Sequence, residues 1–339
     1  MSNKGVSAPY SIRVIISKAL YLCNLFLLIF FIFFPREVIN SARDGLLLWF
    51  NNVLPALLPF IVVVNILVAI GFVRHVSAWA SPFMKTVFKL PGAGGFALIT
   101  GLVSGYPMGA KTIADLSRNG EITDKDAQRL MAFCNNAGPL FIIGVVGVGL
   151  LGDAAAGYAL WAGHVMAAFV VGIYMRRYGE KNENNGMYVR HSNSGNINIG
   201  SVLGESVKNA MEALLLVGGL IIFFSVVTGA VTILLGSLNL RFMPEGLIAG
   251  ALEVTGGVKL LADMAETPVS PLRMAGISGL IGFGGLSVHA QALHFTSGTR
   301  INARVYILHK AVGGVIAALI TMLLWLAFQT YVSSTIMAY

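Results

Sequence analysis

The chain has 339 residues, of which 56% are hydrophobic and 11% charged, with a formal net charge of +8. Soluble domains carry about 25% charged residues, so this composition excludes a soluble globular protein. The basic residues collect in short loops, as they do in bacterial inner membrane proteins, so the charge indicates topology rather than a nucleic-acid partner.

Five apolar segments are long enough to cross a bilayer, since a spanning helix needs about 20 mostly apolar residues. The first is too long for the apolar region of a signal peptide, and no small-residue cleavage site follows it. We therefore expect a multi-pass protein of a bacterial cell membrane, with spans in residues 16–34, 45–72, 154–175, 211–235 and 305–328.

A polar stretch rich in Asn, Ser and Gly separates the apolar segments into two groups. It carries Arg176, Arg177, Lys181 and Arg190, which places it in the cytoplasm by the positive-inside rule. The predicted organisation is an N-terminal membrane helix in residues 1–40, a first membrane repeat in 41–175, a cytoplasmic linker in 176–201 and a second repeat in 202–339.

The two groups resemble each other in sequence. Residues 97–102 (ALITGL) match residues 275–280 (AGISGL), and the groups enter the membrane from opposite sides. Inverted repeats with a site between them are a common plan for secondary transporters, although helical bundles without this symmetry also exist. The expected fold is an all-α polytopic membrane protein of two inverted repeats, with broken helices and re-entrant hairpins.

Residues 104–111 (SGYPMGAK) interrupt an apolar run, because proline lacks a backbone donor and glycine loosens the chain. In the predicted register, residues 282–291 form the equivalent break. Such breaks persist only when they are buried in protein or line a wet cavity. The helix N-terminus after each break favours an anion, and Lys111 and His289 add a potential cation to each half. The alternative is close helix packing at Gly and Pro, with Lys111 extending to the interface.

Two further polar features lie within apolar sequence. Asn135 and Asn136 precede a short apolar run and serve either as helix caps or as donors to a substrate. Glu253 and Thr255 are candidates for coupling to a proton or cation if they lie at membrane depth, whereas at the interface Glu253 is simply solvated. His164 is expected to be a packed core residue.

These features define the predicted site. The predicted substrate-binding residues are Ser104, Gly105, Tyr106, Pro107, Gly109, Lys111, Asn135, Asn136, Gly284, Gly285, Ser287, His289 and Gln291. We expect no cofactor and no metal, because the two cysteines have no metal-ligand spacing. The zinc, phosphate-loop and nucleophile-elbow motifs are absent from the sequence, so we expect no enzyme.

The block at residues 101–111, with residues 120–122 and 133–142 (FCNNAGPLFI), resembles the YlbJ-type sporulation integral membrane proteins. These belong to the nucleoside-recognition or Gate domain group, which is related to segments of concentrative nucleoside transporters and of ferrous iron transport proteins. The resemblance extends over about residues 51–326 and implies a core similar to that of a concentrative nucleoside transporter.

The resemblance also implies a role in endospore formation. The family is associated with moving dipicolinic acid, pyridine-2,6-dicarboxylate, from the mother cell across the outer forespore membrane. A small planar dianion fits the predicted site, with Tyr106 or Phe283 stacking on its ring. The alternatives are a nucleoside or other organic-anion carrier, and a gate or scaffold subunit that moves no solute. The expected partners are the solute, a coupling proton or sodium ion, the bilayer and a second copy of the chain.

Overall fold

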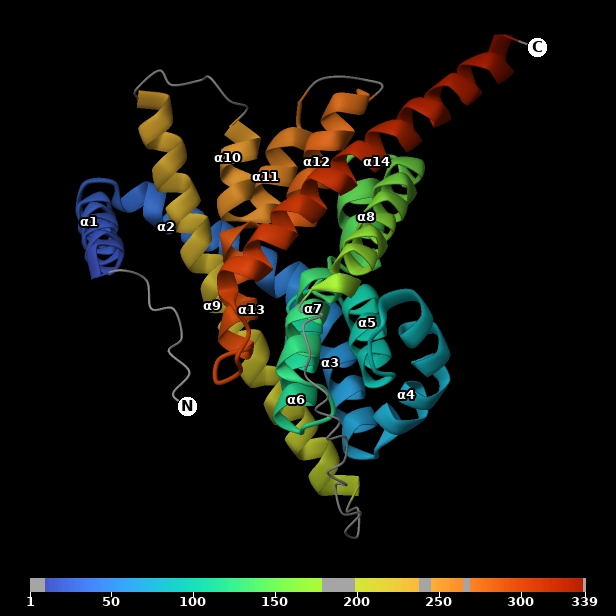
Figure 1. Ribbon diagram of the computed structural model, residues 1–339. Helices are drawn as coiled ribbons and strands as arrows, with labels where there is room; N and C mark the ends of the chain where they lie inside the picture. The colour runs from blue at the N-terminus through green and yellow to red at the C-terminus, as the bar shows by residue number, and fades with distance from the viewer. Residues whose placement is uncertain (1–9, 179–198, 238–244, 265–268, 338–339) are drawn as a thin grey trace.

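The computed structural model describes residues 10–178, 199–237, 245–264 and 269–337. All regular elements within these ranges are helices (Figure 1). Most of the predicted linker, residues 179–198, lies outside the described residues. The elements are α1 (Tyr10–Phe33), α2 (Pro35–Leu48), η1 (Trp49–Val53), α3 (Leu54–Ala69), α4 (Phe72–Phe83), η2 (Met84–Phe88), α5 (Ala93–Val103), α6 (Met108–Arg118), α7 (Asp124–Cys134), η3 (Leu140–Leu150), α8 (Ala154–Tyr174), η4 (Met175–Arg177), α9 (Ile199–Ser237), α10 (Glu245–Leu252), α11 (Val254–Ala262), α12 (Pro271–Phe283), α13 (Gly285–Phe295) and α14 (Ala303–Met337).

Three of the described helices are long and apolar enough to cross a membrane: Ala154–Arg177, Ile199–Ser237 and Ala303–Thr335. They contain the predicted spans at residues 154–175, 211–235 and 305–328. Two bent pairs of helices raise the number to as many as five, and one of them bends by 108° where α1 meets α2. Length and composition therefore support the predicted multi-pass membrane protein.

The predicted span at residues 45–72 is not one regular helix. The turn at η1 is widened into a π-helix, and α3 begins directly after it. Pro55 lacks the N–H that the carbonyl of Asn51 would accept in an α-helix, so the hydrogen-bonding pattern changes there. The widened turn leaves Asn51 and Asn52 exposed between α2 and the apolar helix α3.

Two helical hairpins lie in opposite halves of the molecule. Helices α5 and α6 pack together and reverse direction at residues 104–107, in the lower half of Figure 1. Helices α10 and α11 pack together and reverse at Glu253, in the upper half. We call residues 104–107 tip one and residues 252–255 tip two. Hairpins of opposite orientation agree with an inverted arrangement of two similar halves.

Two other helix pairs are interrupted without reversing. Helix α7 ends at Cys134 and the chain continues into η3 after residues 135–139, while α12 passes into α13 at Gly284. The structure thus differs from the predicted pairing, because residues 104–111 form a hairpin tip whereas residues 282–291 interrupt a helix. A glycine-rich match over a few residues does not fix whether the chain reverses, since either course satisfies the same local backbone.

Antiparallel packing joins the two halves. Helices α2 and α3 run along α9, with the Trp49 indole donating to the carbonyl of Leu214 at 3.0 Å. The Asn65 amide donates to the carbonyl of Ser206 at 3.1 Å, nearer the start of α9. On the other side α14 packs along α12 and α8. The hairpin tips and the interrupted helices are enclosed between these long helices (Figure 1).

Two buried arginines hold helix ends in place. Arg129 donates to the carbonyls of Phe88 at 2.5 Å and Lys89 at 3.0 Å, where η2 ends. Arg273 donates to the carbonyls of Leu261 and Ala262, where α11 ends. Carbonyls at a helix C-terminus lack intrahelical donors, so both guanidinium groups stabilise the fold.

Candidate functional site

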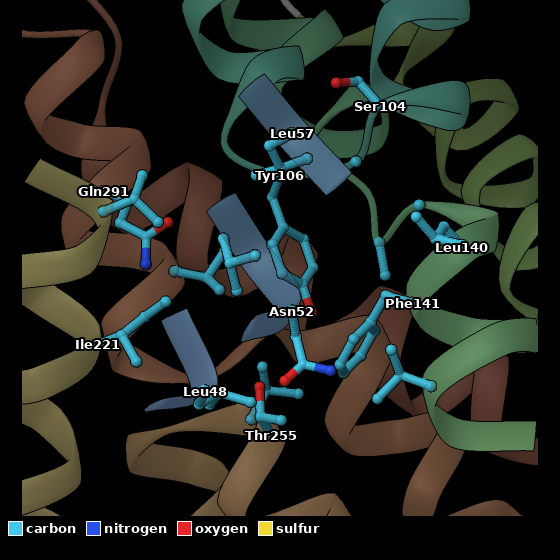
Figure 2. A pocket seen from close by; sticks show the side chains of 18 of the residues that line it. Leu48, Asn52, Leu57, Ser104, Tyr106, Leu140, Phe141, Ile221, Thr255 and Gln291 are labelled. Carbon is cyan, nitrogen blue, oxygen red and sulfur yellow. The ribbon is translucent and has the colours of Figure 1, made fainter. Parts of the chain in front are cut away.

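A cavity of about 610 Å³ lies where the hairpin tips meet the interrupted helices. Figure 2 shows its walls, which come from the end of α2, η1, α3, both tips, η3, α9 and α13. The polar side chains that line it are Asn51, Asn52, Ser104, Tyr106, Glu253, Thr255 and Gln291. The remaining lining is mostly apolar, as in sites for small organic molecules.

Tip one contributes two hydroxyl groups that have no partner in the part of the chain that the structure describes. Tyr106 extends its ring through the middle of the cavity, with the hydroxyl on the side of Asn52 and Phe141 (Figure 2). The hydroxyl oxygens of Tyr106 and Ser104 are both buried and make no hydrogen bond within the described structure. Leaving a buried polar group unpaired costs about 1–3 kcal/mol, so each hydroxyl keeps hydrogen-bonding capacity that the described residues leave unused.

Tip one is fixed against the interruption between α7 and η3. Gly105 has φ +85, in the left-handed region that favours glycine. A Cβ atom added there would lie 2.6 Å from the amide nitrogen of Gly138. Both the conformation and the contact therefore require glycine.

Tip two is fixed in a similar way against the interruption between α12 and α13. Gly285 has φ +74, and an added Cβ atom would lie 2.8 Å from the carbonyl oxygen of Gly250 and 3.2 Å from the amide nitrogen of Val254. The same relation of hairpin tip to interrupted helix thus occurs in both halves of the protein.

Glu253 forms the N-cap of α11 at tip two. Its carboxylate accepts from the backbone N–H of Thr255 at 3.1 Å and of Gly256 at 2.7 Å. The residue is only 4% exposed, which contradicts the alternative that it is simply solvated at the interface. A carboxylate at a helix N-terminus is stabilised by the free N–H groups and by the helix dipole.

The structure brings only part of the predicted site to the cavity. Ser104, Gly105, Tyr106, Gln291, Glu253 and Thr255 line it. The other residues lie outside its lining, and most of them are buried in the packing around the tips. Those residues are Pro107, Gly109, Asn135, Asn136, Gly284, Gly285, Ser287, His289 and Lys111.

Lys111 lines a different cavity, of about 270 Å³, between α3, α6 and the start of α9. Its ammonium group lies 3.2 Å from a carboxylate oxygen of Asp115 and 3.4 Å from the amide oxygen of Asn65. Its charge is therefore balanced away from the central cavity. The predicted register placed Lys111 opposite His289. The structure does not support that pairing, because Lys111 follows a hairpin tip whereas His289 follows an interruption in a helix.

His289 belongs to a buried polar network behind the interruption at residues 135–139. The Tyr306 hydroxyl lies 2.8 Å from the Asn135 amide nitrogen, which donates to it, and 3.2 Å from Nδ1 of His289. Lys310 donates to the carbonyl of Asn135 at 2.8 Å. Phe283 packs edge-on against His289, with ring centroids 4.6 Å apart, and does not line the cavity.

Sequence reasoning missed Lys310, Tyr306 and the role of His164. His164 accepts from the backbone N–H of Ala137 at 3.1 Å, so it supports the interruption rather than only filling the core. A signal for Lys310 was present, because it is a charged residue within the apolar segment 305–328.

The chain is 35% identical to the sporulation integral membrane protein YlbJ of Bacillus subtilis (strain 168) over 327 residues, covering 87% of this chain and 79% of the relative. It belongs to the YlbJ family of sporulation integral membrane proteins. Residues 50–154 of this YlbJ-family chain also match the family model Gate, described as nucleoside recognition. No solved structure matches the chain.

These comparisons confirm the resemblance predicted from residues 101–111, 120–122 and 133–142. The Gate match begins in η1 and ends at the first residue of α8. It therefore contains tip one and the interruption between α7 and η3, which form one side of the central cavity in this YlbJ-family protein.

Proposed function

We propose that this YlbJ-family protein transports a small organic anion, specifically dipicolinate, from the mother cell across the outer forespore membrane. One observation carries the proposal: a cavity of about 610 Å³ between two oppositely oriented hairpin tips, with two buried hydroxyls that have no partner among the described residues. Sites for small molecules commonly have volumes of about 300–1,000 Å³.

The lining suits a planar aromatic solute with polar edges. The rings of Tyr106 and Phe141 offer surfaces for stacking, while Asn52 and Gln291 bring amide donors from η1 and α13 (Figure 2). Thr255 and Ser104 add hydroxyl groups. Aromatic faces with a few placed donors provide affinity and orientation together.

The two tips supply a means of alternating access. Tip one lies against the interruption between α7 and η3, and tip two lies against the interruption between α12 and α13. The two hairpins have opposite orientations. Movement of one tip would open the cavity to one side of the membrane while the other stays closed. A scaffold without solute would have no physical use for two broken helices around a cavity, since unpaired backbone is costly in a membrane.

Glu253 and Thr255 provide a site for ion coupling in this scheme. Binding of a proton or cation to the Glu253 carboxylate would weaken its two hydrogen bonds to the start of α11. The N-cap of α11 would then hold less strongly, so tip two could move. The ion's gradient would thereby drive the opening step.

A nucleoside is the second candidate solute. The observation that favours it is the charge of the cavity wall, where Glu253 is the only charged side chain among the described lining residues. A neutral solute that donates hydrogen bonds would suit that wall without any counter-charge.

Thermal unfolding of the purified full chain in detergent tests these alternatives. Ligand present at 100 times its dissociation constant stabilises the native state by about 2.7 kcal/mol, so millimolar dipicolinate should raise the melting temperature. Millimolar uridine should leave it unchanged. A shift with uridine alone would favour the nucleoside carrier, and no shift with either compound would favour the scaffold.

A further inference from the structure

The described residues of the cavity wall include no positive side chain to balance a dicarboxylate. Three Lys or Arg side chains are buried within the described ranges: Arg129, Arg273 and Lys310. The two arginines are bonded to carbonyl groups at helix ends. Of the three, Lys310 is therefore the one whose charge can serve a solute.

Lys310 has hydrogen-bonding capacity that the protein does not use. It lies on α14, is 4% exposed, and makes one hydrogen bond to the described residues, to the carbonyl of Asn135. An ammonium group has three donors, so two remain unused. No carboxylate of the described residues lies within ion-pair distance of it. Its charge is thus uncompensated inside the protein.

The groups around Lys310 are also incompletely paired. Three buried atoms of the network have no hydrogen-bond partner in the described structure: Oδ1 of Asn135, Nδ1 of His164 and Nε2 of His289. Lys310 lies close enough to both histidine rings for its charge to act on them. Buried polar atoms are normally satisfied, so this group of unpaired atoms indicates a functional requirement rather than packing alone.

The segment that Lys310 contacts also forms part of the cavity wall. Lys310 holds the first residue of the interruption, Asn135, while Ala137 and Gly138 of the same segment line the cavity. Charges in a protein interior act over longer distances than in water, because the local dielectric constant is low. The field of Lys310 therefore reaches a solute on the other side of residues 135–139.

We propose that Lys310 is the residue that makes the central cavity selective for a dicarboxylate. It acts as a positioning residue, because its charge attracts the carboxylates through the interruption while other side chains contact the solute. The inference rests on the proposed function and specifies how that same cavity distinguishes an anion from a neutral solute. It also explains how a wall whose one charged side chain is Glu253 can accept a dianion.

The decisive experiment compares a charged and an uncharged ligand of the same shape. Full-length protein in nanodiscs is titrated with pyridine-2,6-dicarboxylate and with its neutral diamide. Lys310→Gln keeps a donor for the Asn135 carbonyl but removes the charge. We expect it to weaken dicarboxylate binding at least about tenfold and to leave diamide binding unchanged. Lys310→Arg keeps the positive charge and should therefore keep dicarboxylate binding.

Lys259→Gln is the matched control, because Lys259 is exposed on α11 and lies outside the cavity lining. It should bind both ligands as the wild type does. If Lys310→Gln binds both ligands more weakly to the same extent, or binds the dicarboxylate as the wild type does, the inference about Lys310 is wrong. The proposed function would still stand. If the wild type binds neither ligand, the proposed function fails and the inference with it. Should Lys310→Gln not fold, Lys310→Met provides the same comparison.

Discussion

At the scale of single residues, the informative groups are those whose hydrogen bonds are missing. The hydroxyls of Ser104 and Tyr106 are buried without partners, whereas Glu253 is buried with two backbone donors. An unsatisfied hydroxyl destabilises the empty protein and stabilises a complex that pairs it. Removing such a hydroxyl should therefore affect binding and stability in different directions.

Tyr106→Phe tests this expectation. The substitution keeps the ring but removes the unpaired hydroxyl, so the melting temperature of the ligand-free protein should be unchanged or higher. Binding of dipicolinate should weaken by about 2- to 10-fold, since a net hydrogen bond contributes about 0.5–1.5 kcal/mol. Titration calorimetry measures the second effect. Tyr158→Phe, at an exposed position on α8, is the control, and equal affinity in both variants would contradict the assignment.

At the scale of elements, the contact between tip one and the interruption of α7 and η3 depends on Gly105. Gly105 is required there for two reasons, its positive φ and the close approach of Gly138. Gly120 has only the first of these, because its φ is +72 but an added Cβ atom would meet nothing within 4 Å. The two glycines therefore form a matched pair for measuring what the tip contact contributes.

Gly105→Ala should destabilise the protein more than Gly120→Ala. At Gly120 only backbone strain of about 1 kcal/mol is expected. At Gly105 the methyl group must also displace Gly138, which adds about 1–3 kcal/mol by overpacking. Apparent melting temperatures in detergent report the difference. Equal decreases in the two variants would show that tip one does not depend on the close contact.

At the scale of the whole molecule, the inverted arrangement predicts which turns face which side of the membrane. The turn after α6 and the end of α11 lie at opposite ends of the molecule in Figure 1. The turn after α6 should face the cytoplasm, because Arg118 and Lys125 lie near it and the positive-inside rule places basic turns on that side. Asn119 and Asp263 are exposed at these two positions.

Single cysteines at these positions test the arrangement. In a Cys23→Ser background, where Cys134 is buried, Asn119→Cys should react with a membrane-impermeant thiol reagent only from the cytoplasmic side. Asp263→Cys should react only from the opposite side. Reaction of both from the same side would exclude oppositely oriented hairpins.

Local rules are enough for part of this protein. The long apolar runs at 154–175, 211–235 and 305–328 form long helices because a bilayer demands about 20 apolar residues wherever a chain crosses it. Gly and Pro at residues 104–111 and 135–139 likewise predict breaks, because the lost donors and positive φ values are properties of those residues themselves. The family resemblance rests on the same short segments.

Only the tertiary structure decided which breaks face each other and which cation lies behind them. Lys111 and His289 are equivalent in the register predicted from the sequence, but Lys111 pairs with Asp115 within its own helix. Lys310 instead reaches Asn135 across 175 positions of sequence. Contacts of that kind depend on how helices distant in the chain pack together, and no local pattern of residues contains that information.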